Sequence, residues 1–307
     1  MVSANAWAAS SERPIRIIVP FAAGANSDVL TRMIAQRVTE NGGPTFVIEN
    51  RPGGGGTVGA LAARKAEPDG YTLFAANSGT HAILPAIQNV PYDPQNDFVP
   101  VTPLFYFPHF LIVPERLPVK SAQDLVELSK NTPEGLTIGN QGIGTSGHLL
   151  GAMFEQATGG KFVHVPYTGG GGPMNIDVVA GRLDMVFSTY ASLKQHADAG
   201  RVKFLAIASP ERSAVAPEIP TLAEQGIPGV ELDAWFGLVA PAGTPPEAIK
   251  KINEMFVNAA NSPDIVERFK ADGITVMTST PEEFKNFIDR EADRLKKAAE
   301  ASNIRLN

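Results

Sequence analysis

The sequence of 307 residues contains no cysteine, which excludes disulfide bonds and thiolate chemistry. It has no lysine–arginine run, and its net charge is −6, so no nucleic-acid partner is expected. No stretch reaches the roughly 18 consecutive apolar residues of a membrane span. The hydrophobic content of 43% is ordinary for a globular chain that is long enough for two domains.

The usual motifs of catalysis and metal binding are missing as well. The five histidines form neither H-x-x-x-H nor H-E-x-x-H, so no metal site is expected. The nucleophile elbow G-x-S-x-G is absent, and no glycine-rich stretch continues into Gly-Lys-Ser/Thr. Ser78 with His81, or Ser146 with His148, could form a nucleophile and base, but hydroxyls that cap helices explain them more simply. The chain is therefore not expected to be an enzyme.

The first twelve residues have the small-residue composition of a cleaved leader. Two A-x-A patterns overlap there, at 4–6 and 6–8, as at the end of a secretory signal. Residues 1–12 are interpreted as a signal-peptide remnant, with a disordered leader as the alternative. The missing cysteine fits a protein that matures in an oxidising compartment, although many cytosolic proteins lack cysteine too.

Apolar runs with strand character alternate with helical patterns along most of the chain. The predicted strands are 15–19, 46–49, 71–76, 111–113, 136–139, 162–165, 183–187, 203–208 and 235–241. This alternation predicts an α/β fold with mainly parallel sheets flanked by helices. The pattern occurs twice, and a connection rich in proline, 92–100, separates the two series. We expect lobe 1 at 13–103 plus 232–307, lobe 2 at 104–231, and a ligand cleft between them.

Several helix starts carry recognisable signals. Ser121 opens one helix, Thr221 to Glu224 opens another, and Thr280 to Glu283 has the form of a capping box with proline at the first helical position. Long helices are predicted at 245–261 and 281–303, with a shorter one at 263–271.

Two glycine clusters, 54–59 and 142–147, match G-x-G-x-x-G after a strand and before a helix. They leave an NAD-binding oxidoreductase as the alternative function. The acidic residue that should end the next strand is absent, however, because Asn77 and Pro166 follow those strands.

Loops of small and hydroxyl residues follow several predicted strands. After strand 15–19, a loop of small residues leads to Ser27 and Asp28, which could accept hydrogen bonds from the first helix N–H groups. Such a loop can hold an anion through backbone N–H groups and the positive end of the helix. Similar loops begin at Asn77, Asn140, Tyr167 and Ser188. Their recurrence in both halves predicts a shared polar site.

Short motifs along the chain resemble the solute-binding proteins of tripartite tricarboxylate transporters, the Bug receptors. The resemblance runs from residue 14 to about 304. It is carried by IIVPFAAG at 17–24 with Asp28, VIENRPG at 47–53, PDGYTL at 68–73, PYDP at 91–94, HVPY at 164–167, GRLD at 181–184, WFG at 235–237 and APAGTP at 240–245. The chain departs from many relatives at residues 22–25 and at Ser188 and Thr189.

The resemblance implies a two-lobed type II periplasmic-binding fold that closes on a small mono- or dicarboxylate. It also implies membrane-embedded transporter subunits as partners, no cofactor, and a monomer. The ligand-binding residues expected in lobe 1 are Phe21, Ala23, Gly24, Ser27, Asp28, Ser78, Thr80 and His81. Those expected in lobe 2 are Gly144, Thr145, Ser146, Tyr167, Thr168, Gly169, Ser188 and Thr189.

Overall fold

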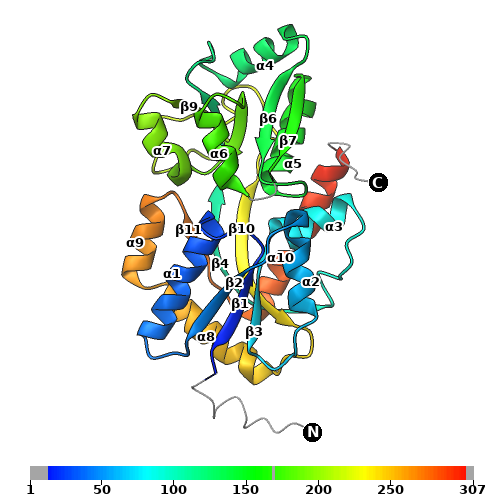
Figure 1. Cartoon of the computed structure of the whole chain (residues 1–307), viewed down its shortest axis with the longest axis vertical. Helices are drawn as coiled ribbons and strands as arrows, with labels where there is room; N and C mark the ends of the chain where they lie inside the picture. Colours follow the sequence, from blue (N-terminus) through cyan, green and yellow to red (C-terminus); the bar gives the residue numbers. More distant parts are fainter. Residues whose placement is uncertain (1–12, 168–169, 302–307) are drawn as a thin grey trace. The chain divides into compact units, whose positions relative to one another are not determined.

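A computed structural model describes residues 13–167 and 170–301, which form two compact units. Unit 1 consists of residues 13–106, 235–269 and 275–296, and unit 2 of most of the intervening chain with 270–274 and 297–301. The main chain therefore passes from unit 1 to unit 2 after Tyr106 and returns after Ala234. Most helices and strands of the two units are labelled in Figure 1.

Unit 1 is built on a six-stranded mixed sheet. Its strands, in spatial order, are β11 (Thr275–Val276), β4 (Phe98–Pro108), β10 (Asp233–Pro241), β3 (Thr72–Asn77), β1 (Ile15–Val19) and β2 (Phe46–Asn50). β1 pairs in parallel with β2 and β3, whereas β10 runs antiparallel to β3. Strand β4 was not expected: its first residues, 98–100, belong to the stretch 92–100 that was predicted as a connection, and no strand was predicted at 101–108.

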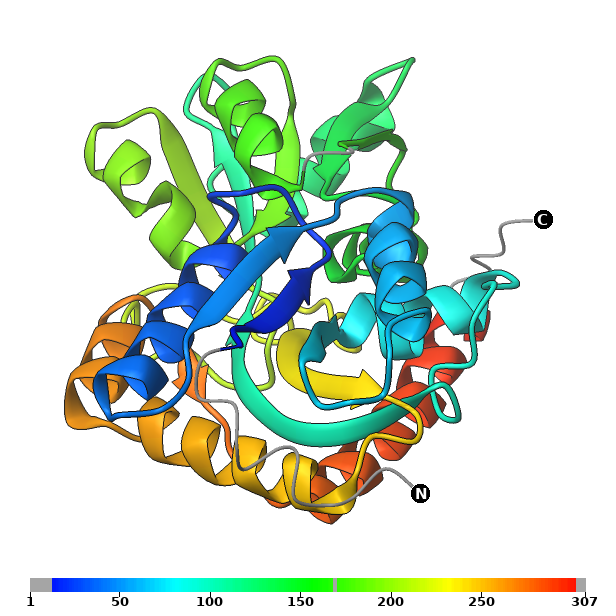
Figure 2. The ribbon, with the colours of Figure 1, turned by 60° about the horizontal axis from the view of Figure 1, so that its bottom comes forward.

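Helices cover both faces of this sheet. They are α1 (Asn26–Glu40), α2 (Thr57–Arg64), α3 (Leu84–Ile87), α8 (Pro246–Ala260), α9 (Pro263–Ala271) and α10 (Pro281–Ala301), with short turns η1 (Gly54–Gly56) and η2 (Gly79–Ile83, a π-helix). α1 and α8 lie together on one side, and α2 and α10 lie on the other (Figures 1 and 2). Phe74, Trp235 and Phe284 form the centre of the core beneath α2 and α10.

Unit 2 contains a five-stranded sheet in the order β7 (Phe162–Pro166), β6 (Leu136–Asn140), β8 (Met185–Ser188), β5 (Phe110–Pro114) and β9 (Val202–Ile207). β6 is parallel to β7 and β8, and β5 is antiparallel to both of its neighbours. Its helices are α4 (Ala122–Asn131), α5 (Ser146–Thr158), α6 (Gly171–Val179) and α7 (Tyr190–Asp198). α6 and α7 pack on one face, and Phe154 of α5 contacts Phe187 of β8 on the other.

Two of the three predicted helix starts are confirmed. Ser121 and Asp124 form a reciprocal capping box at α4, and Thr280 and Glu283 do the same at α10. Each box satisfies N–H groups that have no partner inside the helix.

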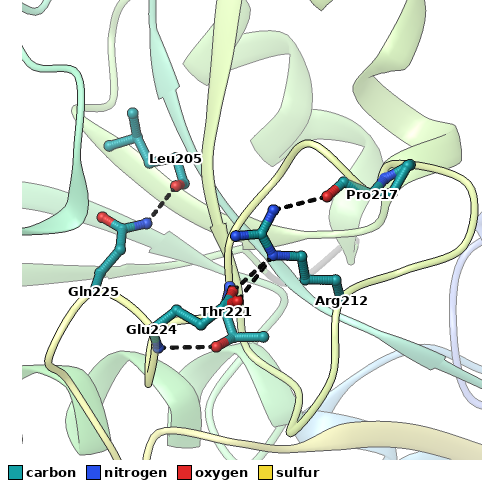
Figure 3. A network of polar contacts seen from close by, with 6 residues as sticks. All are labelled: Leu205, Arg212, Pro217, Thr221, Glu224 and Gln225. Atoms are coloured by element: carbon teal, nitrogen blue, oxygen red, sulfur yellow. Dashed lines mark hydrogen bonds and ion pairs between the residues drawn. The ribbon is translucent and has the colours of Figure 1, made fainter.

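The helix predicted after Thr221 is wrong. Thr221 and Glu224 exchange the bonds of a capping box, at 2.7 and 3.0 Å, but only a turn follows. The chain reverses at Gly226, whose φ of 78° is left-handed, and Pro228 follows. Figure 3 shows that Glu224 also pairs with Arg212. Arg212 in turn donates to Pro217 O at 2.9 Å. The segment after β9 is thereby fixed as an irregular loop.

Candidate functional site

The predicted loops lie at the carboxyl ends of the parallel strands, each within its own unit. In unit 1, β1, β2 and β3 end at Val19, Asn50 and Asn77. In unit 2, β6, β7 and β8 end at Asn140, Pro166 and Ser188. This edge of a parallel sheet is where α/β proteins bind ligands.

In the loop after β1, the carboxylate of Asp28 acts as an internal anchor. It is 2% exposed and accepts hydrogen bonds of 2.9 Å from Gly24 N, Arg32 Nε and Asn50 Nδ2. Asn50 also donates to Phe21 O at 2.9 Å. Burial alone would raise the pKa of Asp28, but these hydrogen bonds and the Arg32 charge outweigh it and lower the pKa. Asp28 is therefore ionised and already paired.

This arrangement corrects the expected capping of α1. Neither Ser27 nor Asp28 is the N-cap; that position is Ala25, which offers no side-chain cap. Asp28 instead accepts from Gly24 N, before the helix, and Ser27 is 4% exposed. Ala23 and Gly24 are exposed, so the outer surface of the loop is backbone and small side chains. The uncapped start of α1 carries partial positive charge toward that surface.

The loop after β3 is buried. Asn77 Oδ1 accepts hydrogen bonds from Gly79 N and Thr80 N at 2.9 and 3.2 Å. Ser78 and Thr80 are 3% and 0% exposed. These side chains thus order the chain around the strand end.

His81, predicted as a ligand contact, lies in the aromatic core of unit 1. It is 1% exposed, its Nδ1 lies 3.0 Å from Thr80 Oγ1, and its ring contacts Phe98 and Trp235 at 5.3 and 6.5 Å between centroids. Burial lowers its pKa from 6.5 to about 3, so the imidazole is neutral at pH 7. Its Nε2 is buried with no hydrogen-bond partner in the described part of the chain.

In unit 2, the hydroxyls at the start of α5 are committed to the protein itself. Thr145 Oγ1 donates to Gly142 O at 2.7 Å, and no side chain caps the helix. Ser146 Oγ lies 3.1 Å from Nε2 of His109 and not of the expected His148. Gly144 N instead points to His148 Nδ1 at 3.5 Å. The N–H groups in the first turn of α5 have no side-chain cap, so they remain available as hydrogen-bond donors.

The remaining predicted residues of unit 2 also have internal partners. The hydroxyl of Tyr167 donates to Asp177 at 2.5 Å. Burial is the larger cause and the Asp177 carboxylate the second cause that raise the pKa of Tyr167 to about 12. Ser188 Oγ donates to Asn175 Oδ1 at 3.0 Å, and Thr189 Oγ1 lies 2.6 Å from Ser192 Oγ. Thr168 and Gly169 lie outside the described residues.

Four residues outside the expected ligand-binding set organise these loops. Asn50, Asn77 and Asn140 each end a parallel strand, and the amide of each bonds to the loop beside it. Nδ2 of both Asn77 and Asn140 is buried and finds no partner among residues 13–167 and 170–301. An asparagine directly after an apolar run was the available signal. No local sequence signal indicated His109, because its partner Ser146 is 37 residues away in the sequence.

Two negative observations apply to residues 13–167 and 170–301. No group of three or more histidine, aspartate or glutamate side chains is placed to bind a metal ion. None of the helices in these ranges combines the length and hydropathy that crossing a membrane requires.

Comparison with known proteins identifies relatives over nearly the whole chain. Residues 30–304 match the model of the tripartite tricarboxylate transporter family receptor. The protein BugT of Bordetella pertussis is 33% identical over 95% of this chain and 89% of its own length. The matched family is one of solute-binding receptors, which removes the oxidoreductase alternative.

Two solved structures are similar in fold and carry carboxylates. Rpa4515 of R. palustris with adipate has a TM-score of 0.91 and 32% identity, covering 96% of this chain and 98% of its own. MatC of Rhodopseudomonas palustris with bound malate has a TM-score of 0.88 and 29% identity, covering 94% and 99%. The expected two-lobed α/β fold of periplasmic binding proteins is confirmed.

Proposed function

The chain belongs to the tripartite tricarboxylate transporter receptor family, and from that premise we propose that it captures a small mono- or dicarboxylate in the periplasm and delivers it to membrane-embedded transporter subunits. The observation that carries the ligand class is the binding of adipate and of malate by two relatives that match almost the full chain. Residues 1–12, interpreted as a signal-peptide remnant, lie outside the described part.

We propose that backbone N–H groups, rather than cationic side chains, hold the carboxylate. The exposed loop at Ala23 and Gly24 and the uncapped start of α5 offer such groups. The polar side chains beside them are already bonded inside the protein, which fixes the loops before the ligand arrives. Neutral donors of this kind suit a receptor that must release its ligand, because a buried charged pair is costly to break.

We further propose that one ligand contacts loops of both units, as the expected closure of the fold requires. The contribution of unit 1 is the loop at Phe21 to Gly24, and that of unit 2 is the start of α5 with the loop after Tyr167. In this proposal Asp28, Ser78, Thr80 and His81 act indirectly, because each is buried and shapes a loop. Ser188 and Thr189 lie at the end of β8 and contribute in the same way.

A thermal-shift screen tests the proposed ligand class. The panel pairs each acid with its neutral amide, for example adipate with adipamide and succinate with succinamide, and adds sugars and NAD. We expect at least one carboxylate to raise Tm by several degrees and its amide to leave Tm unchanged. A ligand present at 100 times its Kd increases the free energy of unfolding by about 2.7 kcal/mol. Shifts with sugars or NAD, and with no acid, would refute the proposal.

A further inference from the structure

His109 occupies an unusual place in unit 2. It lies between β4 and β5, three residues after the main chain enters this unit. The imidazole is only 3% exposed, and Nε2 lies 3.1 Å from Oγ of Ser146, the first residue of α5. Burial lowers the pKa of His109 to about 4, so a neutral ring faces the hydroxyl at pH 7.

The same residue is tied to the segment through which the chain leaves unit 2. The carbonyl oxygen of His109 accepts a hydrogen bond from Ala208 N at 2.8 Å. Leu232 N donates to Ala208 O at 3.1 Å. Nδ1 of the His109 ring is buried and has no hydrogen-bond partner among residues 13–167 and 170–301. His109 therefore joins the start of α5, through its ring, to the strand end at Ala208 and the Leu232 segment, through its carbonyl oxygen.

The start of α5 depends on this contact. Thr145 makes no side-chain cap bond to the helix, and its hydroxyl donates to Gly142 O. Ser146 is 8% exposed, and His109 is the partner of its hydroxyl. Removing the imidazole nitrogen would leave a buried hydroxyl without its partner, which either costs stability or lets the first turn shift.

We propose that His109 is a positioning residue for ligand capture: through Ser146 it sets the position of the first turn of α5 relative to the two segments that join the units. This inference rests on the proposed function, in which that turn supplies N–H donors to the carboxylate. Displacing the turn then weakens binding even though His109 itself does not touch the ligand.

Four variants of the full chain test the proposal. His109→Phe keeps a ring beside Phe107, whose centroid lies 5.8 Å away, but removes the nitrogen. His109→Gln restores a polar group of similar reach. Ser146→Ala removes the other partner, and the double variant completes a cycle. Ser129→Ala is the matched control, because Ser129 is also buried in unit 2 and its hydroxyl bonds to Val126 O and Lys161 N, neither of which belongs to the first turn of α5.

Two readouts keep the inference separate from the proposed function. The first needs no ligand: it is the hydrogen exchange of the Leu149 and Leu150 amides at the start of α5, where Leu149 N donates to Thr145 O at 3.1 Å. The second is the Kd for adipate and for malate by calorimetry. Failure of the wild type to bind any carboxylate would count against the proposed function, and hydrogen exchange would still decide the role of His109.

We expect His109→Phe and Ser146→Ala each to speed exchange at these amides and to weaken binding by about five- to tenfold, with the double variant no worse than either single variant. His109→Gln should stay near the wild type, and Ser129→Ala should lower Tm without changing either readout. The proposal is overturned if the two effects simply add. It is also overturned if His109→Phe changes Tm alone, as Ser129→Ala does.

Discussion

The buried neutral state of His81 makes the stability of unit 1 depend on pH. Its pKa is about 3 in the folded chain and 6.5 in the ordinary unfolded state. Above pH 6.5 the residue is neutral in both states and its contribution is complete. As the pH falls below 6.5, the unfolded chain binds a proton that the folded chain does not, so stability is lost progressively down to pH 3.

The size of this effect follows from the two pKa values. Between pH 7 and pH 5, protonation of one unfolded histidine with a pKa of 6.5 stabilises the unfolded state by about 2 kcal/mol. Over the same range the folded state gains almost no stabilisation, because its histidine has a pKa of about 3 and stays neutral. The lowered pKa of Asp28, from 3.8, acts below this window. His81→Phe keeps an aromatic ring between Phe98 and Trp235 and cannot titrate.

Urea unfolding at pH 7 and pH 5, followed by circular dichroism, measures the difference. The drop in unfolding free energy should be smaller by about 2 kcal/mol in His81→Phe than in the wild type. The other histidines are unchanged in the variant, so their contribution cancels in the comparison. An equal drop in both proteins would refute the assignment of a buried, neutral His81.

Three further substitutions test the packing and the loops. Asp28→Ala removes the carboxylate that accepts from Gly24 N, Arg32 Nε and Asn50 Nδ2, and should cost about 2–4 kcal/mol in urea unfolding; a loss below about 0.5 kcal/mol would contradict the anchoring role. Gly237→Ala places a Cβ 2.3 Å from the ring of Phe284 and should lower Tm, through about 1–3 kcal/mol of overpacking; an unchanged Tm would argue against this packing. Arg212→Ala breaks an exposed ion pair of the loop in Figure 3 and should cost less than about 1 kcal/mol in urea unfolding; a larger loss would contradict this estimate.

Local sequence signals located most regular elements. Strand β1 (Ile15–Val19) and helix α9 (Pro263–Ala271) have the predicted bounds, because an apolar run or a proline start marks each one directly. The capping box at Thr280 was readable for the same reason: its two bonds join residues three apart.

The errors come from contacts that a local pattern does not contain. Strand β4 crosses Pro100 and Pro103, since its pairing with distant strands outweighs the local preference. The capping box at Thr221 is present, but no helix follows it. The chain turns at Gly226, and Glu224 also bonds to Arg212.

The positions of the loops were predictable, but the partners of their side chains were not. The loops follow directly from where the strands end. The roles of their side chains did not, because Asp28, Thr145 and Ser146 all point to partners within the protein. A hydroxyl in a sequence is equally able to meet a ligand or a neighbouring residue, and only the fold decides between them.

The central claim, capture of an organic carboxylate, is tested most directly by identifying what the purified protein carries. Denaturing the protein and analysing the released small molecules by mass spectrometry requires no assumption about the ligand. The account predicts a stoichiometric mono- or dicarboxylic acid that rebinds to the emptied protein. Release of a sugar, a nucleotide or a neutral amide in equal amount, with no acid, would contradict it.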